Sequence, residues 1–132
     1  MLLITKPYCF SYMSVHNPCF ITVNTLSEAK TEIKQIGSDP QSIGIMAPKM
    51  ITKIIKLHEV LLQDAIIVKQ DMLSIGGEVA VPKHTFDLHE NTATILIIGT
   101  IAQHRQLVKK LRRHYPRIQT LASEISSVLE ED

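Results

Sequence analysis

The alternation of apolar and polar positions predicts regular elements from residue 20 onward. Phe20 to Asn24 is a β-rich run that predicts a strand. A helix should follow, because Thr25 and Glu28 have the T-x-x-E spacing of a capping box, in which each side chain can satisfy a free backbone N–H at a helix start. Gly37 stands where a helix usually ends. The expected apolar stripe of this helix is Leu26, Ala29, Ile33 and Ile36.

The rest of the chain switches between the periods of a strand and of a helix. The run 92–98 is apolar enough to predict a central strand that is buried on both faces. The helix at 62–75 should end at Gly76-Gly77 and turn one side inward, with Leu62, Ala65, Ile66, Lys69, Met72 and Leu73. The other expected elements are a short helix or turn within 43–50, strands at 51–60 and 78–81, a helix at 101–114, and an amphipathic helix after Pro116.

This order of elements predicts the α+β fold class. From residue 51 onward, β-α-β-β-α is most of a ferredoxin-like unit, and the strand at 20–24 can supply the fourth strand of a permuted version. We therefore expect a ferredoxin-like sandwich of about four strands with helices on one face and a C-terminal amphipathic helix. A small three-layer α/β domain is the alternative. Residues 1–18 should form an irregular N-terminal segment, and residues 19–132 a single domain.

Composition adds few constraints on function. At 132 residues the chain has the size of one domain, and its formal charge of +1 predicts neither nucleic-acid nor membrane binding. No apolar run approaches the ~20 residues that span a bilayer. Cys9 and Cys19 lack the companions of a zinc site. Two free thiols in a cytoplasmic protein are therefore favoured over a disulfide between them.

Two glycine-containing turns and a lysine are the first candidates for ligand binding. Gly99-Thr100 lies between a buried strand and a helix, where backbone N–H groups and a hydroxyl can hold an anion. The simpler interpretation, which we favour, makes Thr100 only a helix cap. Gly76-Gly77 follows a helix and is better explained as its C-terminal cap. The stem of Lys69 can pack over the core, or its charge can reach an acid or phosphate at the sheet edge together with Lys49.

A run of cations on the next helix is the second candidate. Such runs can bind phosphate backbones, but the chain is nearly neutral and offers few aromatic stacking partners. We therefore favour a solvated face or a docking surface here over nucleic-acid binding. A second contact surface is expected on the stripe of the terminal helix, at Leu121 and Ile125. The cations, with no acid among them, are Arg105, Lys109, Lys110, Arg112, Arg113 and Arg117, of which Arg105, Lys109, Arg112 and Arg113 are the expected contacts.

Metal and catalytic signatures are weak in this sequence. His84, Asp87 and His89 form a loose cluster of ligand types, but polar loop residues of this kind are usually solvated, so no metal is predicted. Ser74 and Ser123 have no recognisable His and Asp partners. The residues themselves therefore predict no catalytic group and no cofactor.

Three short motifs carry a more specific resemblance: Met46-Ala47-Pro48-Lys49, the run KQDMLSIGGEVAV at 69–81, and ILIIGT at 95–100. With the basic helix and a closing LASE at 121–124, they resemble the N-terminal extension ahead of the catalytic barrel in some long bacterial and archaeal dihydropteroate synthases. That extension reads M-A-P-K, L-K-Q-E-M-L-x-x-G-G-x-A-A-V, T-D-V-L-L-M-G-T and L-A-x-E. The resemblance covers roughly residues 43–125.

The resemblance implies a non-catalytic accessory domain of a folate-pathway enzyme that joins a pterin pyrophosphate to p-aminobenzoate. The barrel marker N-x-T-P-D-S-F is not matched by Asn24-Thr25-Leu26-Ser27, so no catalytic residue is carried over. His114-Tyr115-Pro116-Arg117 also departs from the Q-P-F-G of the family. The implied partner is the catalytic barrel, in cis or in trans, or a second copy. The alternatives are a small-ligand regulatory module, argued from fold analogy alone, and a small independent enzyme.

Overall fold

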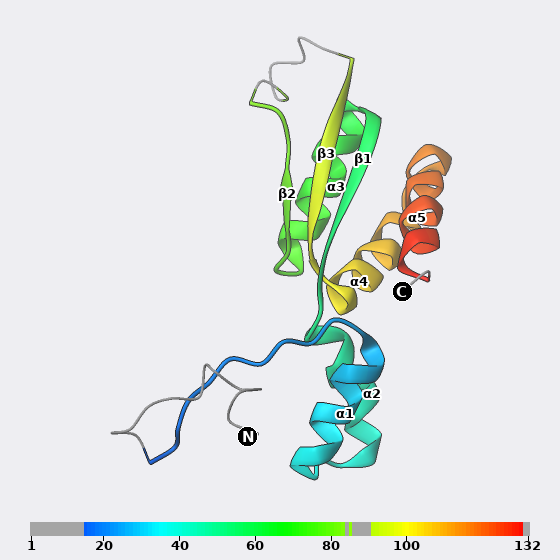
Figure 1. Ribbon diagram of the computed structural model, residues 1–132. Coiled ribbons are helices and arrows are strands. Elements are labelled where there is room, and N and C mark those ends of the chain that lie inside the picture. Colours follow the sequence, from blue (N-terminus) through cyan, green and yellow to red (C-terminus); the bar gives the residue numbers. More distant parts are fainter. Residues whose placement is uncertain (1–14, 84, 86–90, 131–132) are drawn as a thin grey trace.

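The computed structural model describes residues 15–83, 85 and 91–130. The described part is α+β, with five α-helices and an antiparallel sheet of three strands (Figure 1). In chain order the elements are α1 (Leu26–Ile36), α2 (Pro40–Met46), the 3-10 turn η2 (Ala47–Lys49), β1 (Thr52–Leu61), α3 (Leu62–Ser74), β2 (Glu78–Ala80), β3 (Thr92–Thr100), α4 (Ile101–Leu111) and α5 (Pro116–Leu129).

The sheet has the strand order β1-β3-β2, so the apolar strand β3 is central as expected. Thr52 pairs with Thr100 at one end of β1, and Leu61 pairs with Thr92 at the other. The register shifts between Leu57 and Val60, where Glu59 has a φ of 52°. β1 and β2 are the two edge strands.

Helices α3, α4 and α5 cover one face of this sheet. In Figure 1, α3 lies behind the strands and α5 lies beside β1. Alternate strand residues point into the core that these helices share, as the two-residue period of a strand requires. The strands contribute Ile55, Val60, Val79, Ala93, Ile95 and Ile97, and the helices contribute Leu62, Ala65, Val68, Met72, Leu107, Val108, Leu111, Ile118, Ala122 and Ile125.

A second, smaller core joins the N-terminal helices to the end of the sheet where β1 begins. Ala29 and Ile33 of α1 pack there with Ala47 of η2, with Ile51 just before β1, and with Ile101 at the start of α4. Figure 1 shows α1 and α2 below this end of the sheet.

The predicted helix ends are confirmed by their caps. The Thr25 hydroxyl accepts a hydrogen bond from the backbone N–H of Glu28 at 3.1 Å, and α1 ends at Gly37 with a φ of 84°. Gly76, which follows α3, has a φ of 91°. Both glycines adopt the left-handed conformation that residues with a Cβ rarely take.

Four predictions about burial and strands are wrong. Residues 20–24 form no strand, and Phe20 is 82% exposed, since β-propensity acts only where a strand has neighbours to pack on. Strand β3 is fully buried on one face only, because helices cover only that face. Ile36 is 82% exposed on α1. On α3 the buried residues are Leu62, Asp64, Ala65, Val68 and Met72, so this helix is rotated relative to the expected stripe.

Two further findings concern the composition. No helix among the described residues is long and apolar enough to cross a membrane. Cys19 is disulfide-bonded, which contradicts the expected free thiol. Cys9 lies outside the described residues.

Candidate functional site

The turn between β3 and α4 holds the first candidate site residues, and here protein groups occupy the helix N-terminus. The Thr100 hydroxyl accepts a hydrogen bond from the backbone N–H of Gln103 at 3.1 Å, while Gln103 Oε1 accepts one from the Thr100 N–H at 2.9 Å. The Ile101 N–H donates to the carbonyl of Ile51 at 3.0 Å. These donors are therefore not available to an anion, and the structure favours a cap over an anion site.

Gly99 and Gly77 have a packing role around Met72. A Cβ at Gly99 would lie 2.5 Å from the terminal carbon of Met72, and one at Gly77 would lie 2.6 Å from the same atom. Met72 itself is fully buried. The conspicuous glycines of this region thus let β3 and the α3–β2 turn approach a buried methionine.

Lys69 reaches an acid at the sheet edge, but the acid belongs to this chain. Its Nζ lies 3.1 Å from Glu78 Oε1 and donates to the carbonyl of Val79 at 2.7 Å. The hydrogen bond from the Val79 N–H, and then that from Lys69, lower the pKa of Glu78. Lys49 is exposed on η2, whose main contacts are with α1, α2 and α4, whereas Lys69 is engaged with β2. The structure therefore does not bring the two lysines into one site.

The expected docking helix is α4. Its cationic side chains do not form one continuous surface, because they differ in burial and in the groups that they contact. Arg105, Lys109 and Arg112 line a groove of about 380 Å³ between α4 and α5, together with Glu130. Arg113, which follows Arg112 in the sequence, is exposed. Lys110 is half-buried and donates to the hydroxyl of Ser74 at 2.8 Å.

The second expected contact surface, on α5, faces this chain's own core. Ile125 is fully buried, and Leu121 is half-buried against the same core. The apolar stripe of an amphipathic helix fits either a core or a partner, and here the sheet and α4 already cover it. Ile125 is therefore not on a surface that a partner could contact.

A buried carboxylate that sequence reasoning missed links α3 to α5. Asp64 is 2% exposed, in the first turn of α3. Its carboxylate accepts two hydrogen bonds from Arg117, at 2.6 and 2.8 Å, and one from the Tyr115 hydroxyl at 2.7 Å. The Arg117 guanidinium also lies 5.0 Å from the centre of the Tyr115 ring. The partners are 51 and 53 positions from Asp64, so no local pattern could have paired them.

The charges of this cluster explain its pKa shifts. Burial alone would raise the pKa of Asp64, but the hydrogen bonds from Arg117 and Tyr115 and the charge of Arg117 together lower it. The hydrogen bond to Asp64 raises the pKa of Tyr115, and the same carboxylate raises that of Arg117. The cluster is thus a fixed ion pair at neutral pH, which suits a structural link and not proton transfer.

His104 is the second buried polar residue that the sequence did not indicate. It is fully buried on α4, and its Nε2 lies 2.8 Å from the carbonyl oxygen of Lys53 on β1. A carbonyl only accepts, so Nε2 carries the hydrogen and donates it. Among the described residues, Nδ1 has no hydrogen-bond partner. Burial lowers the pKa of His104 more than the hydrogen bonds to the backbone raise it, so the folded protein holds this ring neutral.

The burial of His104 predicts that acid destabilises the fold. The unfolded chain protonates this ring near pH 6.5, whereas the folded chain does so only at lower pH. The unfolded state therefore binds more protons below about pH 6.5, and the free energy of unfolding should fall as the pH drops through that value. In His104→Gln, which keeps an N–H for the Lys53 carbonyl but cannot take up a proton, this slope should flatten. Urea unfolding at several pH values measures it.

His58→Gln is the matched control, because His58 is exposed on β1. This variant should keep the wild-type pH slope. An unchanged slope in His104→Gln would show that other groups cause the acid sensitivity.

One face of the sheet is left open by the helices. Ile54 of β1 is 62% exposed and pairs in register with Ile98 of β3, which is half-buried. In the next row, Lys56 pairs with Leu96, and Leu96 with Ala80 of β2. No described helix lies in front of these strands in Figure 1. We call this surface the outer sheet face and define it by Ile54, Lys56, Ala80, Leu96 and Ile98.

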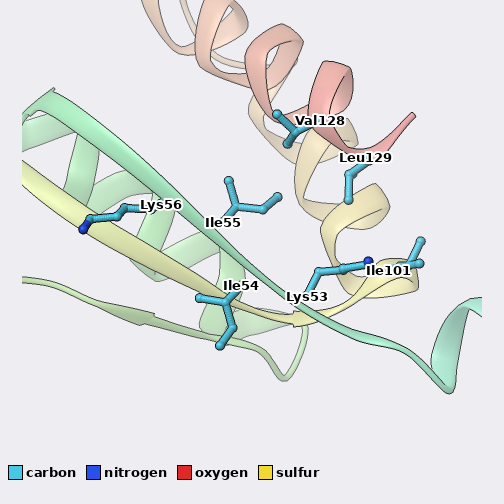
Figure 2. A pocket seen from close by; sticks show the side chains of 7 residues that line it. All are labelled: Lys53, Ile54, Ile55, Lys56, Ile101, Val128 and Leu129. Carbon is cyan, nitrogen blue, oxygen red and sulfur yellow. The ribbon is translucent and has the colours of Figure 1, made fainter. Parts of the chain in front are cut away.

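A groove also runs along the free edge of β1, beside the end of α5 (Figure 2). Its volume is about 350 Å³. Figure 2 shows Val128 and Leu129 of α5 on one side of it and the strand on the other. We call it the β1–α5 groove, and its lining consists of Lys53, Ile54, Ile55, Lys56, Ile101, Val128 and Leu129.

The loose histidine cluster cannot be placed, because His84, Asp87 and His89 lie outside the described residues. Within the described ranges, no three His, Cys, Asp or Glu side chains come together as metal ligands would. Comparisons of the chain with protein-family models, with curated proteins and with solved structures found no match.

Proposed function

We propose that this chain is a non-catalytic interaction domain that docks on a partner through the outer sheet face. The observation that carries the proposal is the one-sided sheet, with three helices on one face and apolar residues left open on the other. Ile54 is 62% exposed beside the half-buried Ile98 and Leu96. Contiguous exposed apolar residues bounded by polar ones are typical of protein contact surfaces. Lys56 and Glu78 provide such a polar boundary on the two edge strands.

The occupied polar groups support a role without catalysis. The groups with candidate chemistry are engaged in caps or ion pairs inside the chain: Thr100 with Gln103, Lys69 with Glu78, and Asp64 with Arg117. A catalytic group needs access to a substrate and a pKa suited to its task. The most buried of these groups, Asp64, is instead held as a carboxylate by its neighbours.

The partner we propose is the catalytic barrel of a dihydropteroate synthase, in cis or in trans. This follows from the motifs at 46–49, 69–81 and 95–100, two of which lie around the Met72 packing site. Such a partner implies a folate-pathway role and a cytoplasmic location. A cytoplasmic location in turn predicts that the disulfide at Cys19 is open to reduction in the cell.

The ferredoxin-like fold is part of this proposal. In a β-α-β-β-α-β unit the fourth strand lies beside the first, which corresponds here to the free edge of β1. The order β1-β3-β2, with α3 between β1 and β2 in the chain, fits the other three strands of such a unit.

The outer sheet face can be tested with a pair of matched substitutions. Ile54→Asp places a charge at the exposed apolar residue of the outer sheet face, whereas Ile36→Asp makes the same change on α1, where the side chain is 82% exposed. Co-elution of each variant with a separately expressed dihydropteroate synthase barrel measures binding. We expect Ile54→Asp to weaken binding at least about tenfold, because the charge would be desolvated, and Ile36→Asp to leave it unchanged. Equal binding by both variants would contradict docking through this face.

A further inference from the structure

The groove between α4 and α5 gathers positive charge that has no partner among the described residues. The two helices pack against each other (Figure 1), and Arg105, Lys109 and Arg112 line the groove of about 380 Å³ between them. All three side chains are exposed. Within the described part of the chain they make no hydrogen bond or ion pair, whereas Lys69 and Arg117 each pair with an acid. The groove therefore presents three cations to solvent.

These cations form one row along α4. Positions 105, 109 and 112 are four and three residues apart, the spacing that places side chains on one face of a helix. Like charges at this spacing repel each other. The negative end of the helix dipole favours cations at 109 and 112, but Arg105 lies near the middle of α4, which spans Ile101–Leu111. The dipole alone thus does not explain the row, and a negatively charged ligand would relieve its repulsion.

The rest of the lining is mostly apolar or neutral. Val108 is 5% exposed and Leu129 is half-buried, so both present apolar surface to the groove. Ser126 is half-buried and offers a hydroxyl, and Glu130 is the one acid among the lining residues. Three cations against one carboxylate leave the lining net positive. Apolar walls with a few polar groups, in a volume of about 300–1,000 Å³, are typical of small-molecule sites.

The length of the row indicates how many anionic groups a ligand needs. Seven residues of α-helix rise about 10 Å, which exceeds the size of one phosphate group. Each phosphate brings close to two negative charges at neutral pH and three acceptor oxygens, to which arginine can donate in pairs. Two phosphates therefore match the three cations in a small volume. Carboxylates, with one charge each, would have to be more numerous to do the same.

We propose that the groove between α4 and α5 binds a small molecule that carries at least two phosphate groups. Arg105, Lys109 and Arg112 hold the phosphates. Val108 and Leu129 contact the rest of the ligand. A nucleic-acid strand is not the proposed ligand, because the row covers only two helical turns and the chain offers few aromatic stacking partners. The site does not depend on the dihydropteroate synthase partner, because α4 and α5 cover the opposite face of the sheet from the outer sheet face.

Calorimetric titration of the full-length chain with inorganic tripolyphosphate tests the site. At about 0.15 M salt, where charges beyond about 8 Å are largely screened, we expect saturable binding of one tripolyphosphate per chain. Arg105→Gln and Lys109→Gln should each raise the dissociation constant at least about fivefold, because each removes a charge-assisted contact. Arg113→Gln is the matched control, since it removes the same charge from an exposed residue outside the lining. This control should change the constant by less than about twofold.

Glu130→Gln gives a readout of the opposite sign. It removes the acid of the lining, so tripolyphosphate should bind more tightly than to the wild type. The substituted side chains are all exposed, and the melting temperatures of the four variants should therefore stay close to that of the wild type. A change in affinity then reports on the groove and not on the fold.

Several results would overturn this site. The absence of tripolyphosphate binding would do so, and so would equal weakening by Arg105→Gln and Arg113→Gln, which would show a general effect of charge. Inorganic phosphate that binds as tightly as tripolyphosphate would contradict the need for two groups. Tighter binding of an oligoglutamate peptide would assign the groove to an acidic protein segment instead. Ile54→Asp should still bind tripolyphosphate, which separates a failure of the docking proposal from a failure of this one.

Discussion

Met72→Ala is expected to lower the free energy of unfolding by about 2–5 kcal/mol, the range for large-to-small changes at buried apolar sites. Met72 is fully buried between α3, the α3–β2 turn and β3, and its terminal carbon fills the space that Gly77 and Gly99 leave open. Neither glycine has a side chain that could move into the cavity. The surroundings should therefore collapse little, which favours a large effect. Urea or thermal unfolding of the purified variant measures it.

Leu73→Ala is the matched control for this prediction. Leu73 is the next residue on α3 and is 46% exposed, although the sequence pattern placed it on the inward stripe. Its truncation should cost less than about 1 kcal/mol. If the two variants lost equal stability, the orientation of α3 in the structure would be contradicted.

Asp64→Ala should also destabilise the fold, by about 2–4 kcal/mol, because it removes three hydrogen bonds to a buried carboxylate that joins α3 to α5. The effect should stay below the upper limit for buried pairs, because the Arg117 side chain is 47% exposed and can turn to water. The lowered pKa of Asp64 adds a pH signature. Its contribution is present above the pKa of an unfolded aspartate, about 3.9, and is lost as the pH falls below it.

A double-mutant cycle with Arg117→Ala isolates this interaction. In the Asp64→Ala background, Arg117→Ala should have little further effect, because its partner is already gone. Chemical denaturation of the four proteins gives the coupling energy. Additive losses would mean that Asp64 and Arg117 stabilise the fold independently, against the geometry described here.

Much of the fold could be predicted because local signals set the element ends. Thr25 and Glu28 mark the start of α1, and Gly37 and Gly76 end their helices in the left-handed conformation. The apolar run of β3 predicted a central strand, which the sheet order confirms. These features depend on residues within a few positions of each other, which is the range over which a sequence pattern carries information.

The wrong predictions concern features that depend on contacts between residues far apart in the sequence. The pattern at 62–75 suggested one inward face, but Asp64 turns inward to meet Tyr115 and Arg117, which follow about 50 positions later. The apolar residues of β3 suggested burial on both faces, yet Leu96 and Ile98 are only half-buried, and no described helix lies in front of the strands in Figure 1. The run 20–24 has the composition of a strand, but it is not one of the three strands of the described sheet.

For the candidate site residues, the sequence predicted the structural roles better than any ligand-binding role. Thr100 is a helix cap, and Gly99 leaves room for the buried Met72 side chain. Lys69 does reach an acid at the sheet edge, as one interpretation proposed, but that acid is Glu78. The open outer sheet face could not be inferred from the sequence, because the same apolar residue types occur at half-exposed positions and in the core.

Calorimetry with the wild-type chain tests the central claim most directly. The chain would be titrated into a separately expressed dihydropteroate synthase barrel from the same organism, and the pterin condensation activity of the mixture would be assayed. The account predicts saturable binding together with a change in the activity or the stability of the barrel. No heat of binding and no effect on the barrel would contradict the role of this chain as its docking domain.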